Sequence, residues 1–191
     1  MKITAIEIFK RHPFGVGNGK FLEEAKKLGE NPKTVYVVGG LGVDSISKTN
    51  LLTKLFSSKV KFAGTTGIVI KEITPQKAQL FLANKKAVQN HIGGIHAIAA
   101  AVLAESATGI VFGMNVPDSK LPLLKSMQVN YQRRMQGGLS AIARLSEEQI
   151  ALITQEEKGN VFVPVTIEDE SGQAPIECQM EWAWVSKKRA K

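Results

Sequence analysis

The sequence predicts an α+β fold in which an antiparallel β-sheet is wrapped around one long central helix. Residues 91–114 are apolar on every side of a helix, which is typical of a helix buried in a protein core. The second half of the chain contains four segments in which apolar and polar residues alternate, separated by short turns. Such segments predict an antiparallel meander with one polar face. A single buried helix beside this meander is best covered if the sheet curls around it.

The first 56 residues are predicted to form a helical extension. Residues 21–28 are amphipathic, and residues 45–58 carry apolar side chains close to helical spacing. The pattern then changes, because residues 67–74 are rich in β-branched side chains and residues 78–82 resume an extended pattern. These two segments predict a pair of strands separated by a turn that contains a proline.

The alternating segments are predicted as four strands, at residues 127–132, 139–145, 161–167 and 176–184. A short helix is expected between the second and third strands, at residues 146–159. Gly137-Gly138 and residues 169–172 predict turns. Pro164 has no N–H to donate to a neighbouring strand, so we expect an edge or a bulge at this position.

The positive charge of the chain is concentrated at its two ends. The formal net charge is +8, of which residues 1–60 contribute +5, and the tail at residues 187–191 carries four Lys or Arg. The body between them is close to neutral. Because a nucleic-acid-binding module concentrates basic residues on one element with interleaved aromatic residues, we do not expect nucleic acid to be the main partner.

Several absences define the expected compartment and chemistry. The N-terminus lacks the uninterrupted apolar core of a secretory signal. The longest apolar run, at residues 92–114, carries Glu105 near its middle, where a charge is costly in lipid, so we expect a cytoplasmic protein without a membrane partner. The single cysteine excludes an internal disulfide and a Cys-rich zinc site, and no metal is expected. Glycine clusters at residues 15–20 and 37–42 are interpreted as turns, because neither completes a nucleotide-binding pattern.

Two features of the buried helix suggest a functional site. Glu105 is the one charged residue in an otherwise apolar stretch, and burying an unpaired carboxylate costs free energy or raises its pKa. At the start of the helix, Asn90, His96 and two glycines precede free backbone N–H groups that favour an oxyanion. The structural alternatives are that Glu105 faces solvent or a partner chain, and that Asn90 only caps the helix.

These residues resemble the central-helix motif of hotdog-fold acyl-CoA thioesterases of the phenylacetate-pathway type. The motif is Asn90-x-x-Gly93-x-x-His96, followed by Leu-Ala-Glu at residues 103–105. The strand at residues 129–131, with the basic residues after it, and the hairpin at residues 169–172 are also similar to that family. The whole chain is most similar to an uncharacterised bacterial branch that has an N-terminal helical extension. The resemblance implies a dimeric hotdog domain at residues 57–186, an extension at 1–56 and a basic tail at 187–191.

The resemblance also implies a role for each residue of the motif. The Asn90 side chain would contact the thioester carbonyl, the backbone N–H of Ala97 would form the oxyanion hole, and Glu105 would be the catalytic base or nucleophile. His96 would orient its neighbours or pack as a structural residue. Where the family commonly has glycines, this chain has Ala97 and Ile98, which keeps the backbone donor but narrows the site. Some of three basic residues would meet the phosphates of coenzyme A or remain solvated: Lys125, Arg133 and Arg134.

Helix geometry predicts that the site is shared between two subunits. Ala97 and Glu105 are eight residues apart, which corresponds to about 12 Å along a helix axis, so they cannot contact one carbonyl within one chain. We therefore expect a homodimer or a tetramer with an acyl-CoA as the ligand and no cofactor beyond coenzyme A itself. Hydrolysis of the thioester is the favoured function. The alternatives are a hydratase or dehydratase that uses His96 with Glu105, and a module that binds acyl thioesters without turnover.

Overall fold

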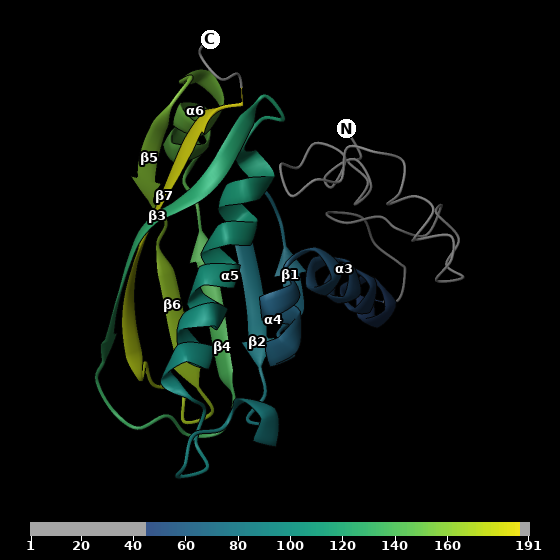
Figure 1. The fold of residues 1–191 in the computed structure, drawn as a ribbon, viewed down its shortest axis with the longest axis vertical. Coiled ribbons are helices and arrows are strands. Elements are labelled where there is room, and N and C mark those ends of the chain that lie inside the picture. Colours follow the sequence, from purple (N-terminus) through teal and green to yellow (C-terminus); the bar gives the residue numbers. More distant parts are fainter. Residues whose placement is uncertain (1–44, 188–191) are drawn as a thin grey trace.

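A computed structural model describes residues 45–187 as two antiparallel sheets around one helix (Figure 1). The central helix α5 spans Ala97–Asn115. One sheet has the strand order β1-β2-β4-β6, and the other has the order β3-β7-β5. The strands are β1 Val69–Ile73, β2 Lys77–Leu82, β3 Lys120–Tyr131, β4 Leu139–Arg144, β5 Gly159–Phe162, β6 Val165–Asp169 and β7 Ile176–Ser186. The predicted arrangement of a sheet wrapped around one central helix is confirmed.

The two sheets share one bent stretch of chain, formed by β5 and β6. The backbone N–H of Val163 donates to Met180 in β7 at 2.9 Å, whereas the carbonyl of Pro164 accepts from Arg144 in β4 at 3.0 Å. The chain therefore leaves one sheet and joins the other between these two residues. Because proline cannot donate to a ladder, the change of partner falls where the ladder is already interrupted, as Pro164 led us to expect.

Helix α5 provides the centre of the core. Side chains along its length are fully buried against both sheets, including Leu103, Ala107, Val111 and Phe112. The Phe112 ring packs against two tryptophans of β7, with ring centroids 5.5 Å from Trp182 and 6.3 Å from Trp184. Within residues 45–187, α5 is the one helix long and apolar enough to span a membrane, and 72% of its apolar window is buried inside the protein.

The structure corrects the predicted pairing of the late strands. They do not form a meander, because β3 pairs with β7 while β4 pairs with β2 and β6. The strand predicted at residues 161–167 is divided between β5 and β6, which belong to different sheets.

Several predicted boundaries also change. Helix α5 begins at Ala97 and not at residue 91, because the preceding residues form a loop in which Gly93 has φ of 76°. β3 begins at Lys120, seven residues before the predicted start at residue 127, with Pro122 tolerated because β3 pairs with a neighbour on one side only. Helix α6 spans Glu147–Gln155 and ends before residue 159, where β5 begins.

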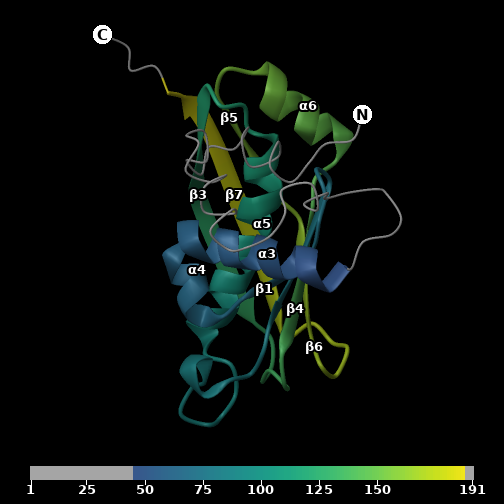
Figure 2. The ribbon, with the colours of Figure 1, turned by 90° about the vertical axis from the view of Figure 1, so that its right-hand side faces the viewer.

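In the part of the chain that the structure describes, two helices precede the first strand, and they lie in front of α5 and β1 in Figure 2. They are α3, at Ser45–Lys59, and α4, at Lys61–Thr66. The hydroxyl of Thr53 accepts a hydrogen bond from the backbone N–H of Ile70 in β1 at 2.9 Å, and Phe56 joins the same core as α5. The predicted helix at residues 21–28 and both glycine clusters lie outside the described residues.

Helix α6 is fixed at both ends by side chains. Ser146 and Gln149 form a capping box at its start, with each side chain bonded to the other's backbone N–H. At its end, the ammonium group of Lys120 donates to the carbonyl oxygens of Ile153, Thr154 and Glu156, at 2.9, 3.1 and 2.6 Å. Lys120 is only 7% exposed, so this cation compensates the negative end of the helix from inside the protein.

Removing the Lys120 ammonium is expected to destabilise the fold. A Lys120→Met substitution keeps an unbranched apolar stem but leaves three carbonyls without their donor, so we expect a loss of about 2–4 kcal/mol in the free energy of unfolding. Guanidinium denaturation measures this loss. The matched control is Lys125→Met, which removes an exposed ammonium paired with Glu181 at 2.8 Å and should cost less than about 1 kcal/mol. Equal losses for the two variants would contradict the capping role of Lys120.

Candidate active site

The loop that leads into α5 is held by the side chain of Asn90. The Oδ1 atom of Asn90 accepts hydrogen bonds from the backbone N–H groups of Ile92 and Gly94, both at 3.1 Å. Two N–H donors aimed at the same side-chain atom identify it as the oxygen, which fixes the orientation of the amide. The Nδ2 group of Asn90 has no hydrogen-bond partner among the described residues. The loop therefore presents an amide donor just before the helix begins.

The first turn of α5 leaves two backbone donors, at Ala97 and Ala99, without an acceptor among the described residues. His96 is the N-cap, and its Nδ1 atom accepts from the backbone N–H of Ile98 at 3.1 Å, while its carbonyl accepts from Ala100 at 3.1 Å. Within residues 45–187 the N–H of Ala97 has no acceptor. It lies at the positive end of the helix dipole, where a developing oxyanion is stabilised. His96 therefore has a structural role, as the cap of the helix that carries this donor.

Glu105 lies farther along α5, on the side of the helix that also carries Ile98, Val102 and Gly109. These positions fall within one narrow stripe at 100° per residue. The carboxylate is partly buried and has no cation beside it among the described residues; its one hydrogen bond is a long one, from Ser106 Oγ at 3.5 Å. Burial raises the pKa of Glu105 above its ordinary value, and the hydrogen bond from Ser106 opposes this only in part. A carboxyl with a raised pKa suits a general base or acid.

Helix α5, which carries this stripe, also packs against β3, a strand with an open edge. This strand pairs with β7 alone, and its inward-facing residues Met127 and Tyr131 remain 52% and 46% exposed. Ile98, on the first turn of α5, is 55% exposed. Across the ladder, Met127 and Tyr131 face buried residues of β7. An unpaired edge with exposed apolar side chains is a surface suited to a second chain.

The structure separates the three predicted phosphate-binding residues. Arg134 donates to the carbonyl of Ile92 at 3.2 Å and so lies beside the loop that leads into α5. Lys125 is exposed and pairs with Glu181, which faces away from the core. Arg133 pairs with the buried carboxylate of Asp169 at 2.9 Å and joins the loop after β3 to the β6–β7 hairpin. Of the three, only Arg134 contacts the loop that leads into α5.

Asp169 shows why Arg133 is held in place. Burial alone would raise the pKa of this carboxyl, but hydrogen bonds from the Ser171 hydroxyl, from Arg133 and from backbone N–H groups outweigh burial and hold the pKa well below its ordinary value. The Ser171 and Gln136 contacts are 2.6 and 2.9 Å long. Arg133 is thus committed to a buried ion pair. The sequence did not indicate this role, because nothing near Arg133 in the chain distinguishes it from Arg134.

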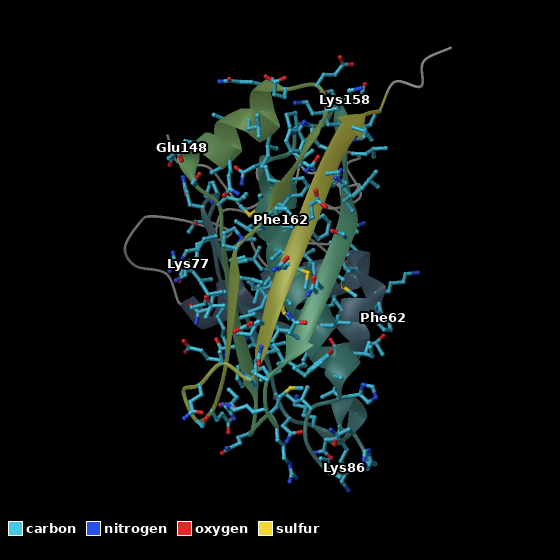
Figure 3. All side chains as sticks on the ribbon, turned by 90° about the vertical axis from the view of Figure 1, so that its left-hand side faces the viewer. Phe62, Lys77, Lys86, Glu148, Lys158 and Phe162 are labelled. Atoms are coloured by element: carbon cyan, nitrogen blue, oxygen red, sulfur yellow. The ribbon has the colours of Figure 1, made fainter. Side chains whose placement is uncertain are left out.

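Asn90, His96 and Ala97 are therefore brought together at one end of the molecule, whereas Glu105 stands apart. Ala97 and Glu105 belong to the same uninterrupted helix, so the distance of about 12 Å expected along its axis applies. Lys86, in the segment before this loop, marks the end of the molecule opposite Lys158 and α6 (Figure 3). Among the described residues, no group of three or more His, Cys, Asp and Glu side chains is arranged to hold a metal ion.

A comparison with known protein families identifies the family of this chain. Residues 48–185 match the model of a domain of unknown function, DUF4442. The chain belongs to this family. A comparison with curated protein sequences gives no match.

Solved structures show the fold of this DUF4442 protein. A Pseudomonas aeruginosa protein of unknown function, described as a probable thioesterase, is 24% identical with a TM-score of 0.65, and the match covers 78% of this chain and 99% of that one. A Haemophilus influenzae thioesterase is 14% identical with a TM-score of 0.59, covering 74% and 92%. A Staphylococcus aureus thioesterase is 16% identical with a TM-score of 0.56, covering 65% and 98%. These likenesses confirm the predicted fold, a sheet wrapped around one long central helix.

The raised pKa of Glu105 predicts a stability gain on its neutralisation. As the pH rises past about 4.3, Glu105 ionises in the unfolded state before it ionises in the folded state. The free energy of unfolding of the wild type therefore falls with rising pH until the pH passes the raised pKa. Glu105→Gln cannot titrate and is expected to have a higher Tm than the wild type at pH 8, with the difference vanishing below pH 4. Thermal unfolding across this pH range measures it. Glu168→Gln, which changes an exposed carboxylate of β6, should leave Tm unchanged at both pH values; a pH-independent difference for Glu105→Gln would contradict the prediction.

Proposed function

We propose that this DUF4442 protein is an acyl-CoA thioesterase. The observation that carries the proposal is the pairing on α5 of a partly buried carboxylate without a cation, at Glu105, with a free backbone donor at the start of the same helix, at Ala97. A carboxylate in that state can take a proton from water, and a helix N-terminus can receive the charge that develops on a carbonyl oxygen. The fold-level likeness to thioesterases supports the same reaction class.

The proposed reaction uses three groups of the chain. The Nδ2 donor of Asn90 and the N–H of Ala97 would hold the thioester oxygen as it becomes negative. Glu105 would take a proton from a water molecule whose oxygen bonds to the carbonyl carbon. When the C–S bond breaks, the carboxylic acid would return that proton to the departing thiolate, which leaves a free acid and coenzyme A. Direct attack by the Glu105 carboxylate, with later hydrolysis of the anhydride, needs the same groups.

The distance between the donors and the base supports a site shared by two chains. A group at Glu105 is about 12 Å from the start of its own helix, so the base for a carbonyl bound at Ala97 would come from the partner subunit. The unpaired edge of β3 supports this arrangement, because β3 packs against α5 and exposes inward-facing Met127. A homodimer in which the two β3 strands lie side by side would bury this apolar surface.

The spacing of residues in one structural neighbour supports the same pair. The S. aureus thioesterase is known with a glutamine replaced by alanine, and also with a glutamate replaced by alanine that lies fifteen positions farther along the chain. Asn90 and Glu105 are separated by the same fifteen positions, and an asparagine offers the same terminal amide as a glutamine. This match in chemistry and spacing favours Asn90 and Glu105 as the groups that act on the substrate.

The state of His96 favours hydrolysis over hydration of an acyl thioester. Its Nδ1 atom already accepts the N–H of Ile98, so in the neutral ring the other nitrogen carries the proton and cannot act as a base. A hydratase mechanism that uses His96 with Glu105 would have to break this cap. For the carrier, we propose that Arg134 contacts a phosphate of coenzyme A, because Lys125 and Arg133 already have carboxylate partners.

Replacing Glu105 is expected to abolish most of the turnover. For Glu105→Gln we expect kcat for acyl-CoA hydrolysis to fall by about 10²–10³-fold, in the range of a lost general base, with KM changed little. Release of free thiol measures the rate across acyl chain lengths. Glu168→Gln is the matched control and should keep wild-type kcat. An unchanged kcat in Glu105→Gln would remove Glu105 from the mechanism, and tight binding of acyl-CoA without turnover by the wild type would favour a binding module instead.

Mixing two inactive variants tests whether the site is shared. Asn90→Ala and Glu105→Gln homodimers should each be almost inactive. The two variants are unfolded together and refolded, so that half of the dimers contain one chain of each variant. If each site takes Asn90 from one chain and Glu105 from the other, each of these mixed dimers has one intact site out of two. About a quarter of wild-type activity should then return. If both residues act within one chain, no hybrid contains an intact site and no activity returns, which would contradict the shared site.

A further inference from the structure

The hydroxyl of Tyr131 makes a contact that the proposed mechanism does not use. Tyr131 is the last residue of β3, and its Oη donates to the carbonyl oxygen of Ala97 at 2.8 Å. The other hydrogen bonds of this first turn are local, between His96 and the backbone of Val88, Ile98 and Ala100. Within residues 45–187, Tyr131 is therefore the one side chain from outside the loop and helix that hydrogen-bonds to the first turn of α5.

This contact joins two parts of the proposed site that the backbone does not join. The first turn of α5 carries the oxyanion donor of Ala97. β3 is the strand whose open edge would meet the partner subunit, and the partner would supply Glu105. A hydrogen bond between the end of β3 and Ala97 thus fixes the donor relative to the strand that determines where the partner lies. The proposed reaction depends on the distance between the Ala97 donor and the carboxylate that the partner would supply, because small misplacements of reacting groups lower the rate steeply.

The environment of Tyr131 keeps its hydroxyl a donor. Burial, and to a smaller extent the nearby thiol of Cys178, raises the pKa of Tyr131 above its ordinary value. The phenol therefore stays protonated and can donate to a carbonyl at neutral and moderately basic pH. The ring is held on one side by the ladder between β3 and β7, where Tyr131 faces the buried Ile176. The hydroxyl is therefore aimed at Ala97 by the strand itself.

We propose that Tyr131 is a positioning residue for the thioester reaction: its hydroxyl holds the first turn of α5, and with it the N–H of Ala97, in a fixed place against β3. The role rests on the proposed thioesterase function, since it concerns the oxyanion donor of that reaction. Tyr131 does not touch the reacting atoms.

The test compares Tyr131→Phe with a variant at the other end of the same helix. Tyr131→Phe keeps the packed ring and removes only the hydroxyl, and we expect kcat to fall about tenfold while KM stays within about twofold. The control is Asn115→Ala, which removes side-chain hydrogen bonds of 2.7 Å to Pro75 and 2.8 Å to Val111 and so loosens the end of α5 far from Ala97. This control should keep wild-type kcat, whatever its loss of stability.

A second measurement separates this inference from the proposed function. Hydrogen exchange of the hydrogen-bonded backbone amides of Ile98 and Ala100 should be at least about fivefold faster in Tyr131→Phe than in the wild type, and unchanged in Asn115→Ala. Unchanged exchange, or faster exchange with wild-type kcat, would overturn the positioning role. If the wild type hydrolyses no thioester, the proposed function fails, and the exchange rates alone decide whether Tyr131 holds the first turn.

Discussion

The whole structure depends on the need to bury a helix that has no polar side. Helix α5 carries small and apolar residues around its full circumference, and no single sheet face can cover such a cylinder. The chain covers it with two sheets, between which it crosses at Val163 and Pro164, and with α4 on the remaining flank. The small side chains of α5 let the sheets approach closely. At Gly109, for example, an added Cβ would lie only 2.9 Å from the ring of Trp182.

The candidate site lies where this covering is incomplete. A narrow stripe of α5 beside β3 stays partly open, and it holds the helix's one carboxylate together with Ile98 at the first turn. Partial burial raises the pKa of Glu105, and no cation among the described residues pairs with it. The same fold that excludes water from the core thus leaves one reactive group at its boundary. Under the proposed function, a helix that otherwise serves packing would also supply the base.

The sequence predicted the fold well because the signals for it were local and periodic. The central helix and the late strands follow from the spacing of apolar residues, and the break at Pro164 follows from a missing N–H. The start of α5 was misplaced because the glycine turn before it is set by Asn90, whose side chain bonds to backbone groups that no periodicity reveals. The roles of Lys120, Arg133 and Tyr131 could not be predicted, because their partners lie more than 30 residues away in the chain. Glu105 and Asn90 were indicated by the residues themselves, as a lone carboxylate in a buried helix and a polar side chain at its start. The family resemblance added the roles of Asn90, Ala97 and Glu105, and spacing along the helix showed that Glu105 stands apart from the other two.

The sheet edges of this chain are not equivalent. The outer edge of β1 is blocked by α3, whose Thr53 accepts an N–H of that strand, and α6 reaches β5 through Gln149, which donates to the carbonyl of Phe162 at 2.8 Å. Among the described residues, β3 has no comparable cover for its backbone. A chain with two open edges can add copies without limit and grow into a fibre, whereas a chain with one can pair only once. The edge strands of the two sheets are β1, β6, β3 and β5, and helices cover two of them, β1 and β5. Under the proposed pairing through β3, these helices would keep a dimer from adding further copies at the edges that they cover.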